Sequence, residues 1–257
     1  MAIEKIQAFV LQTLPYRESS GIFYLLTQRQ GVVHGIAKGI RTKKTSASFL
    51  ERGFLIETLL YVRPHRELHV LGDIHIVKYY PATRDNLIKT ALRDAVFETI
   101  VTAVEVEHPY PELFTLASKF LECLEGQTSD SPALLWKFFH AFSTLLGFGF
   151  NTDACVVCGK KAAAVKSAYM VMEKGGFACE TCVGQKDRRN MVPAGLLPAL
   201  KFTDDCALED AIAHLSATDA RRITRLLAAY CHFHGETKTE YHALEFLDTV
   251  LFNEQLR

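Results

Sequence analysis

Two pairs of cysteines offer the clearest chemistry in the sequence. Cys155 and Cys158 form one C-x2-C pair, and Cys179 and Cys182 form a second pair after an interval of twenty residues. A two-residue gap lets both sulfurs of a turn point at one ion, and four thiolates complete a tetrahedral shell. The spacing therefore predicts a site for one Zn²⁺ ion. Its role should be structural, because a closed shell leaves no position for water or substrate.

The residues around the pairs support a zinc ribbon. Gly159 follows the first pair and Gly184 lies two residues beyond the second, and we expect both to adopt the positive φ that tight turns need. Between the pairs, residues 165–178 are typical of a β-hairpin whose turn lies at 174–176. We predict a ribbon over about residues 152–184.

Redox chemistry, disulfides and catalytic zinc are the alternatives for these cysteines. A redox pair would open a helix in a βαβ setting, which neither pair does, and seven cysteines in an expected cytosolic protein disfavour a disulfide framework. His65 and Glu67 form the H-x-E of zinc nucleobase deaminases. However, Ala154 replaces the proline of their P-C-x-x-C motif, and the second cysteine pair would have no role.

The other cysteines and histidines carry weaker signals. Cys123, Cys206 and Cys231 are isolated, and we interpret them as buried small apolar residues. A second group of polar residues could cluster on one face of the barrel: His65, His69, Asp73 and His75. We do not interpret them as a metal site, because alternating polar residues on a half-exposed strand need no metal. The sequence contains no G-x-S-x-G, H-E-x-x-H or Walker A motif, so it predicts no enzyme.

Positive charge is concentrated near the N-terminus. The first eighty residues contain eleven Lys and Arg against six Asp and Glu, although the whole chain has a net charge of zero. Residues 37–44 read AKGIRTKK. A solvated loop is the plain interpretation, but a surplus of one sign favours a polyanionic partner. The candidate DNA-binding residues are Lys38, Arg41, Lys43, Lys44 and Arg17. Aromatic residues that could stack on bases, although most must be core, are Tyr16, Phe23, Tyr24, Phe49 and Tyr61.

Five short segments before residue 80 have strand character. They are rich in β-branched and aromatic residues and are separated by Gly, Pro, Ser or charged clusters. They cover residues 6–14, 21–28, 31–37, 53–62 and 67–80. Five strands in this length predict a small closed barrel, for which an OB-fold is the first candidate and an SH3-like barrel the competitor.

The period changes from two to 3.6 after Pro81. Residues 87–104, 131–149, 218–233 and 240–252 have helical apolar periodicity. In the second of these, we expect Ser131 to cap the helix and Pro132 to lie in its first turn. The fold class is therefore α+β, with an OB-fold domain at 1–80 and a helical domain at 81–257 that the ribbon interrupts.

Hydrophobic residues make up 49% of the chain, which is enough for a globular core. Glu4 and Lys5 interrupt any signal peptide, and the most apolar later stretch contains Lys137 and His140. We expect a cytosolic protein without a membrane segment.

The order of these features resembles the bacterial RecO recombination-mediator family. The resemblance is strongest over VLQTLPYRESSGIFYLLTQRQGVVHGIAKGIRTKK and continues with ELHVLGDIHIVKYYPATRDNL. It implies an OB-fold, a helical domain and a zinc element. It also implies non-enzymatic DNA repair and recombination: binding of single- and double-stranded DNA, strand annealing and, with RecR, help in loading RecA onto DNA coated by single-strand-binding protein (SSB).

The resemblance also implies sites and partners. The family's basic patch falls on Lys38 and Arg41, with Lys43, Lys44 and Arg17 as neighbours. The implied partners are DNA, RecR and the acidic C-terminal tail of SSB, with RecF as a further candidate, in the bacterial cytoplasm at the nucleoid. Arg221, Arg222 and Arg225 are candidates for a basic rim that receives the tail. The alternative function is a zinc-ribbon adaptor that binds another protein and has no DNA function.

Overall fold

The computed structural model describes residues 2–41, 50–127, 132–199, 215–235 and 242–252. The chain divides into two compact units. The first comprises Met1–Gln127 with Glu236–Ala243, and the second comprises Thr128–Gly235 with Leu244–Arg257. None of the described helices combines the length and the apolar character needed to cross a membrane.

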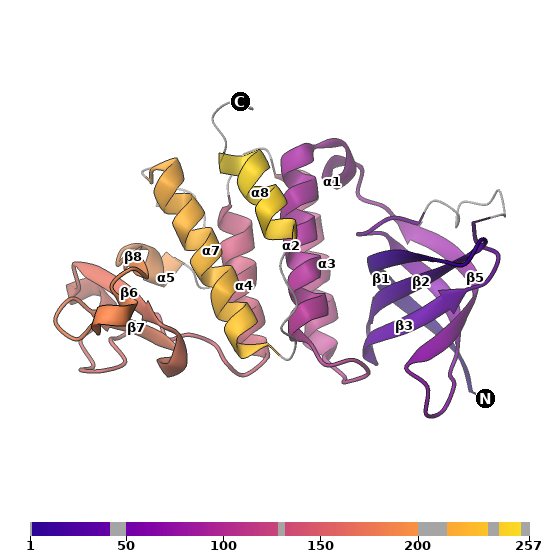
Figure 1. Cartoon of the computed structure of the whole chain (residues 1–257), viewed down its shortest axis with the longest axis horizontal. Coiled ribbons are helices and arrows are strands. Elements are labelled where there is room, and N and C mark those ends of the chain that lie inside the picture. The colour runs from indigo at the N-terminus through magenta and orange to yellow at the C-terminus, as the bar shows by residue number, and fades with distance from the viewer. Residues whose placement is uncertain (1, 42–49, 128–131, 200–214, 236–241, 253–257) are drawn as a thin grey trace. The chain divides into compact units, whose positions relative to one another are not determined.

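The first unit contains a closed five-stranded barrel (Figure 1). Its strands are β1 (Ile3–Tyr16), β2 (Ser20–Thr27), β3 (Gly31–Ala37), β4 (Leu55–Tyr61) and β5 (Leu68–Lys78). The order around the barrel is β1-β2-β3-β5-β4, with β3 parallel to β5 and the other pairs antiparallel. The predicted OB-fold is confirmed.

The long strand β1 closes the barrel because it pairs with both β2 and β4. Residues 3–9 of β1 pair with β4 and residues 8–16 pair with β2, with a register shift between Val10 and Gln12. Side chains alternate between the two faces of a strand, so every second residue points inward. The barrel core accordingly contains Ala8, Val10, Phe23, Leu25, Val33, Ala37, Ile56, Leu60 and Leu71.

Three helices belong to the same unit as the barrel: α1 (Pro81–Asp85), α2 (Leu87–Ala103) and α3 (Pro111–Gly126). The Asn86 side chain accepts a hydrogen bond from the Lys89 N–H and so caps α2. Proline begins both α1 and α3, where a missing N–H costs nothing. Helix α3 lies outside every segment predicted as helical.

Helices α4 (Ala133–Leu145), α5 (Leu196–Ala199), α7 (Ala217–His234) and α8 (His242–Phe252) follow. Helix α4 begins at Ala133 and Pro132 occupies its N-cap position, so the prediction that Pro132 lies in the first turn is wrong by one residue. Ser131 lies outside the described residues. The Trp136 indole N–H donates to the Thr224 hydroxyl over 2.8 Å, which joins α4 to α7 inside the second unit.

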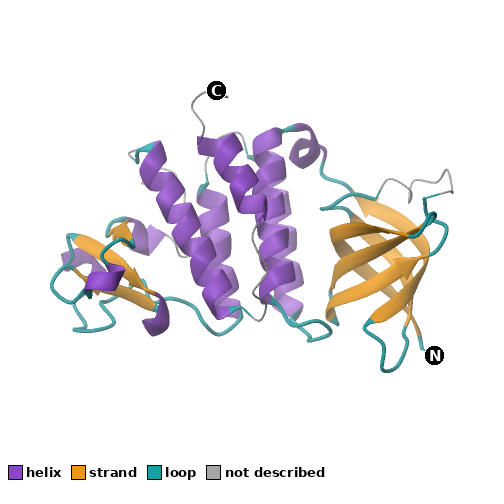
Figure 2. Cartoon of the chain, viewed as in Figure 1, coloured by secondary structure: helices purple, strands orange, loops and turns teal. Residues whose placement is uncertain are grey.

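The second unit also contains a small three-stranded sheet of β6 (Ser167–Val171), β7 (Gly176–Cys179) and β8 (Met191–Pro193), in the order β7-β6-β8 (Figure 2). A short 3-10 turn at Met172–Lys174 joins β6 to β7, and Gly175 adopts a left-handed conformation with φ of 60°. This turn is the hairpin predicted between the two cysteine pairs.

Candidate metal centre and nucleic-acid interface

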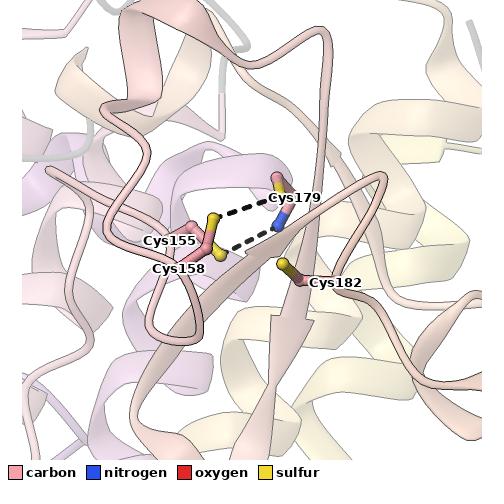
Figure 3. Close-up of side chains that lie close together, drawn as sticks. All are labelled: Cys155, Cys158, Cys179 and Cys182. Carbon is pink, nitrogen blue, oxygen red and sulfur yellow. Dashed lines mark hydrogen bonds between the residues drawn. The ribbon is translucent and has the colours of Figure 1, made fainter.

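The four paired cysteines meet at one point. The sulfurs of Cys155, Cys158, Cys179 and Cys182 all lie within 4.8 Å of one another (Figure 3). The Cys158 and Cys179 sulfurs are 3.7 Å apart. Four Zn–S bonds of about 2.3 Å place the sulfurs of a tetrahedron about 3.8 Å apart. The cluster therefore has the size and the all-sulfur donor set that a Zn²⁺ ion requires.

Tight turns hold each pair in place. The Gly159 N–H donates to the Cys155 carbonyl over 2.9 Å, and the Cys182 N–H donates to the Cys179 carbonyl over 3.0 Å. Gly159 has a φ of 75°, which confirms its predicted left-handed conformation. Gly184 has a φ of −72°, so the same prediction for Gly184 is wrong. The second turn closes without a left-handed residue at that position.

Hydrogen bonds around the sulfurs favour the thiolate form at two of the cysteines. Burial raises the pKa of Cys155, but backbone N–H groups, including that of Cys179 at 3.3 Å, outweigh burial, and the net pKa is lowered. The Thr181 hydroxyl, 3.1 Å from the Cys179 sulfur, lowers the pKa of Cys179 to about 6. The hydrogen bond with Cys179 raises the pKa of Cys182 to about 12. Thiolates are the metal-binding form of cysteine.

Thr181 is a residue that the C-x2-C pattern does not predict. It lies inside the second pair, and its hydroxyl also approaches the Cys182 sulfur at 3.9 Å. Groups of this kind orient metal ligands and tune their basicity. A hydroxyl residue between two ligand cysteines is the sequence signal that points to such a role.

Within the described part of the chain, no second group of side chains competes with the cysteine cluster for a metal ion. The cysteines there are free thiols, and the four-sulfur cluster is its one group of three or more close metal-ligating side chains, which does not include His65. Cys231 is buried as predicted, whereas Cys123 is exposed on α3, so that prediction is wrong. Cys206 lies outside the described residues.

Aromatic residues fix the ribbon to α7 within the second unit. The Tyr230 hydroxyl donates to the Phe148 carbonyl over 2.7 Å, and His234 Nε2 lies 3.0 Å from the Met172 carbonyl oxygen. The rings of Phe148 and His234 stack with centroids 5.2 Å apart. Loss of the ribbon's shape would therefore also remove contacts of α7.

Three of the predicted DNA-binding residues come together at one end of the barrel. The Arg41 N–H donates to the Ser19 carbonyl over 2.9 Å, and the Arg41 guanidinium lies 3.4 Å from the Arg17 carbonyl. Arg17, Lys38 and Arg41 are all exposed. Arg17 and Lys38 line an open hollow of about 720 Å³, which also contains Tyr16, Ser19 and Ile36. Lys43 and Lys44 lie outside the described residues.

The arginines proposed as a rim for an acidic tail already bind carboxylates of this chain. Arg222 pairs with Asp219 at 2.8 Å, and Arg221 approaches Asp248 at 3.4 Å. Arg225 also pairs with Asp248, which is almost fully buried. Arg221 and Arg225 therefore hold α7 to α8, whereas Arg222 pairs within α7, and an incoming acidic peptide would compete with these internal partners.

Comparison with known proteins gives the family of this chain. The family model for the N-terminal part of recombination protein O matches residues 1–80, and the model for its C-terminal part matches residues 84–240. The chain belongs to the RecO family. The two RecO matches meet beside Pro81, where α1 begins.

Several relatives are similar over nearly their whole length. The DNA repair protein RecO of Chloroherpeton thalassium is 26% identical, and the match covers 97% of this chain and 100% of the relative. The RecO of Syntrophus aciditrophicus is 27% identical over 97% of this chain and 96% of its own length. That of Chlorobium limicola is 28% identical, with 90% and 92% covered. RecO family membership supports a role in DNA repair.

Proposed function

We propose that this protein is a non-enzymatic recombination mediator. It binds single- and double-stranded DNA, anneals complementary strands and, with RecR, helps load RecA onto SSB-coated single strands. The observation that carries the proposal is the grouping of Arg17, Lys38 and Arg41 at one end of an OB-fold barrel. Barrels of this type bind single strands with residues from their loops and from the faces of strands two and three.

The mechanism requires charge neutralisation and no bond chemistry. Phosphate contacts from Lys and Arg release counterions, which supplies affinity without regard to base sequence. Arg41 is held beside Arg17 by the backbone of the β1–β2 turn, so these two residues stay close together. Two strands held close with reduced repulsion can pair, which is the proposed basis of annealing.

We assign a structural Zn²⁺ ion to Cys155, Cys158, Cys179 and Cys182. The ion would hold two turns of the ribbon together and supply folding free energy. We propose RecR, the C-terminal tail of SSB and RecF as partners, and the bacterial cytoplasm at the nucleoid as the location. The internal pairing of Arg221, Arg222 and Arg225 gives no support to those residues as the site for the tail.

The first test is a salt titration of single-strand binding by fluorescence anisotropy. With about five phosphate contacts, the slope of log affinity against log salt is about −3.5, so affinity should fall on the order of 100-fold between about 50 and 200 mM salt. Combined Lys38→Glu and Arg41→Glu substitutions should abolish most of the binding and reduce the slope. Lys119→Glu on α3 is the control, since Lys119 is exposed and does not line the hollow that contains Arg17 and Lys38.

Two results would contradict the proposal. A folded Lys38→Glu/Arg41→Glu variant that binds like the parent would refute the site. Absence of salt-sensitive binding in the parent would favour the adaptor function instead. An annealing assay with SSB-coated complementary strands, with and without RecR, tests the mediator activity itself, because an adaptor without DNA function would not anneal them.

A further inference from the structure

The outer face of β2 and β3 carries an aromatic pair. Tyr24 and His34 lie opposite each other in the register of the two strands, and their rings stack with centroids 3.9 Å apart and planes 23° apart. Their neighbours Phe23 and Val33 are buried in the barrel core, so the pair points away from it. Both rings are half-buried. The two rings therefore form one stack on the outer side of the barrel, in which each ring covers one face of the other.

An open hollow of about 410 Å³ adjoins this pair. It is lined by His34, His65, Arg66, Glu67, Val106 and Glu107. One wall is the His34 side chain with Tyr24 behind it, and the others come from the β4–β5 connection and the α2–α3 connection. The hollow lies wholly within the first unit.

The α2–α3 connection is fixed against the barrel. The Glu107 N–H donates to the Val32 carbonyl over 2.8 Å, and a Cβ on Gly31 would lie 1.8 Å from the His108 carbonyl oxygen. His69 accepts from the Arg63 N–H at Nδ1, over 3.2 Å, so its Nε2 carries the proton that faces Glu107 at 3.1 Å. The hollow is thus preformed, which reduces the entropy lost when a ligand binds.

The lining has the chemistry of a nucleobase site. Burial lowers the pKa of His34, which keeps its ring neutral at neutral pH and suited to stacking. The carboxylates of Glu67 and Glu107 repel phosphate but accept hydrogen bonds from base amino groups, as Glu does with cytosine N4. Arg66 can take a phosphate at the edge of the hollow. The base therefore fits inside and the backbone outside.

The hollow is in line with the basic residues. His34 and Ile36 occupy alternate positions of β3 and share its outer face, and Lys38 follows directly after the last residue of the strand. Ile36 itself lines the hollow that contains Lys38 and Arg17. A single strand whose phosphates contact Lys38 can therefore place a neighbouring nucleotide over His34.

We propose that the hollow beside His34 is a subsite for one nucleobase of a bound single strand, with a preference for bases that carry an amino group over thymine. This inference rests on the proposed DNA binding and adds a base-contacting site to it. A lysine or arginine side chain of a protein partner is the competing occupant, since carboxylates beside an aromatic ring also suit a cation. The nearby phosphate-binding cations favour the nucleobase.

The test compares labelled oligo-dC and oligo-dT of equal length on the full chain. The parent should bind oligo-dC about 5-fold or more tightly than oligo-dT. His34→Ala should weaken binding of both by about 5- to 100-fold, since it removes the stacking surface. His75→Ala, at an exposed position of β5 outside the hollow, is the matched control.

Glu67→Ala tests the carboxylate without removing the stack. Loss of a negative charge raises affinity for every strand, so the readout is the dC-to-dT ratio, which should fall toward one. Glu18→Ala makes the same charge change among the basic residues and should leave the ratio unchanged. Circular dichroism melting verifies that each variant is folded.

The outcomes separate the two proposals. Equal binding of oligo-dC and oligo-dT, with His34→Ala like the parent, would refute the subsite and leave DNA binding intact. No binding of either strand at low salt would refute both. If an oligolysine peptide bound the parent but not His34→Ala, while DNA binding did not change, the hollow would be a site for cationic side chains and the subsite proposal would fail.

Discussion

Gly159 and Gly184 stand in similar places after their cysteine pairs but have different conformations. Gly159 has a φ of 75° with open space around its Cβ position, whereas Gly184 has a φ of −72° and its Cβ would meet only Asp187, at 3.7 Å. A residue with a side chain is strained in the first conformation and relaxed in the second. The backbone torsion φ therefore decides which of the two glycines cannot be replaced without strain.

Alanine substitutions at the two glycines should therefore differ. Gly159→Ala should lower the free energy of unfolding by about 1 kcal/mol, and Gly184→Ala should change it by less than about 0.5 kcal/mol. Urea unfolding followed by the fluorescence of Trp136, the chain's single tryptophan, measures both. Equal effects would contradict the assignment of the strained turn.

The buried hydrogen bond between Trp136 and Thr224 gives a second prediction for single residues. Thr224→Val leaves the indole N–H without its partner and should cost about 1 to 3 kcal/mol. In the double variant with Trp136→Phe no donor remains unpaired, so its cost should be smaller than the sum of the two single costs. Urea unfolding of the parent, the two single variants and the double variant, monitored by circular dichroism, completes this double-mutant cycle. Additive costs would show that the hydrogen bond contributes nothing.

At the scale of helices, Asp248 of α8 links α8 to α7. Its nearly buried carboxylate receives Arg225 and Arg221 from α7, so one acidic side chain of α8 takes two cations of α7. Removing a charged partner from a mostly buried site leaves the remaining groups poorly satisfied. We therefore expect these ion pairs to stabilise the packing of α8 on α7, although the arginine side chains are half-exposed.

Asp248→Asn should therefore destabilise the second unit by about 1 to 2 kcal/mol. Glu173→Gln, which removes the fully exposed pair with Lys186, should have no measurable effect because solvent screens such pairs. Urea midpoints from Trp136 fluorescence provide the comparison. Similar midpoints for the two variants would mean that Asp248 does not anchor α8.

For the whole molecule, the four-cysteine cluster and the basic residues Arg17, Lys38 and Arg41 belong to different compact units. Structural zinc contributes about 10 to 16 kcal/mol in zinc-finger peptides, so its loss should act first on the unit that binds it. The barrel has its own closed sheet and core. Stability and DNA affinity should thus respond separately to the metal.

Chelation or Cys155→Ser should lower the temperature at which Trp136 fluorescence reports unfolding, while single-strand affinity at low temperature should change little. Stoichiometric metal analysis before and after chelation identifies the ion, with one Zn²⁺ per chain expected. A metal-free protein of unchanged stability would refute the structural role. Lost DNA affinity at full stability would show that the cluster takes part in binding.

Local patterns in the sequence determined much of this molecule. The limits of β3, Gly31–Ala37, are those predicted, because Val32, Val33 and Ile36 favour a strand and the Lys38-Gly39 turn follows it. The four clustered cysteines were identifiable because the geometry of a metal site requires a short, fixed spacing of its ligands. Cys123 shows the limit of composition: it is exposed because the helical period of α3 buries Leu121 and Leu124 instead.

Only the tertiary structure decided which distant residues meet. Arg41 contacts the backbone of Arg17 because the start of β2 pairs with the end of β3, so the residues just before β2 and just after β3 lie close together. The hollow at His34 combines β3 with the β4–β5 connection and the α2–α3 connection, which no spacing in the sequence specifies. Local propensity fixes the elements, whereas register and packing fix the neighbours of each surface residue. The sequence alone therefore determined the barrel and the four-cysteine cluster, and the folded chain decided the shape of the proposed DNA-binding surface.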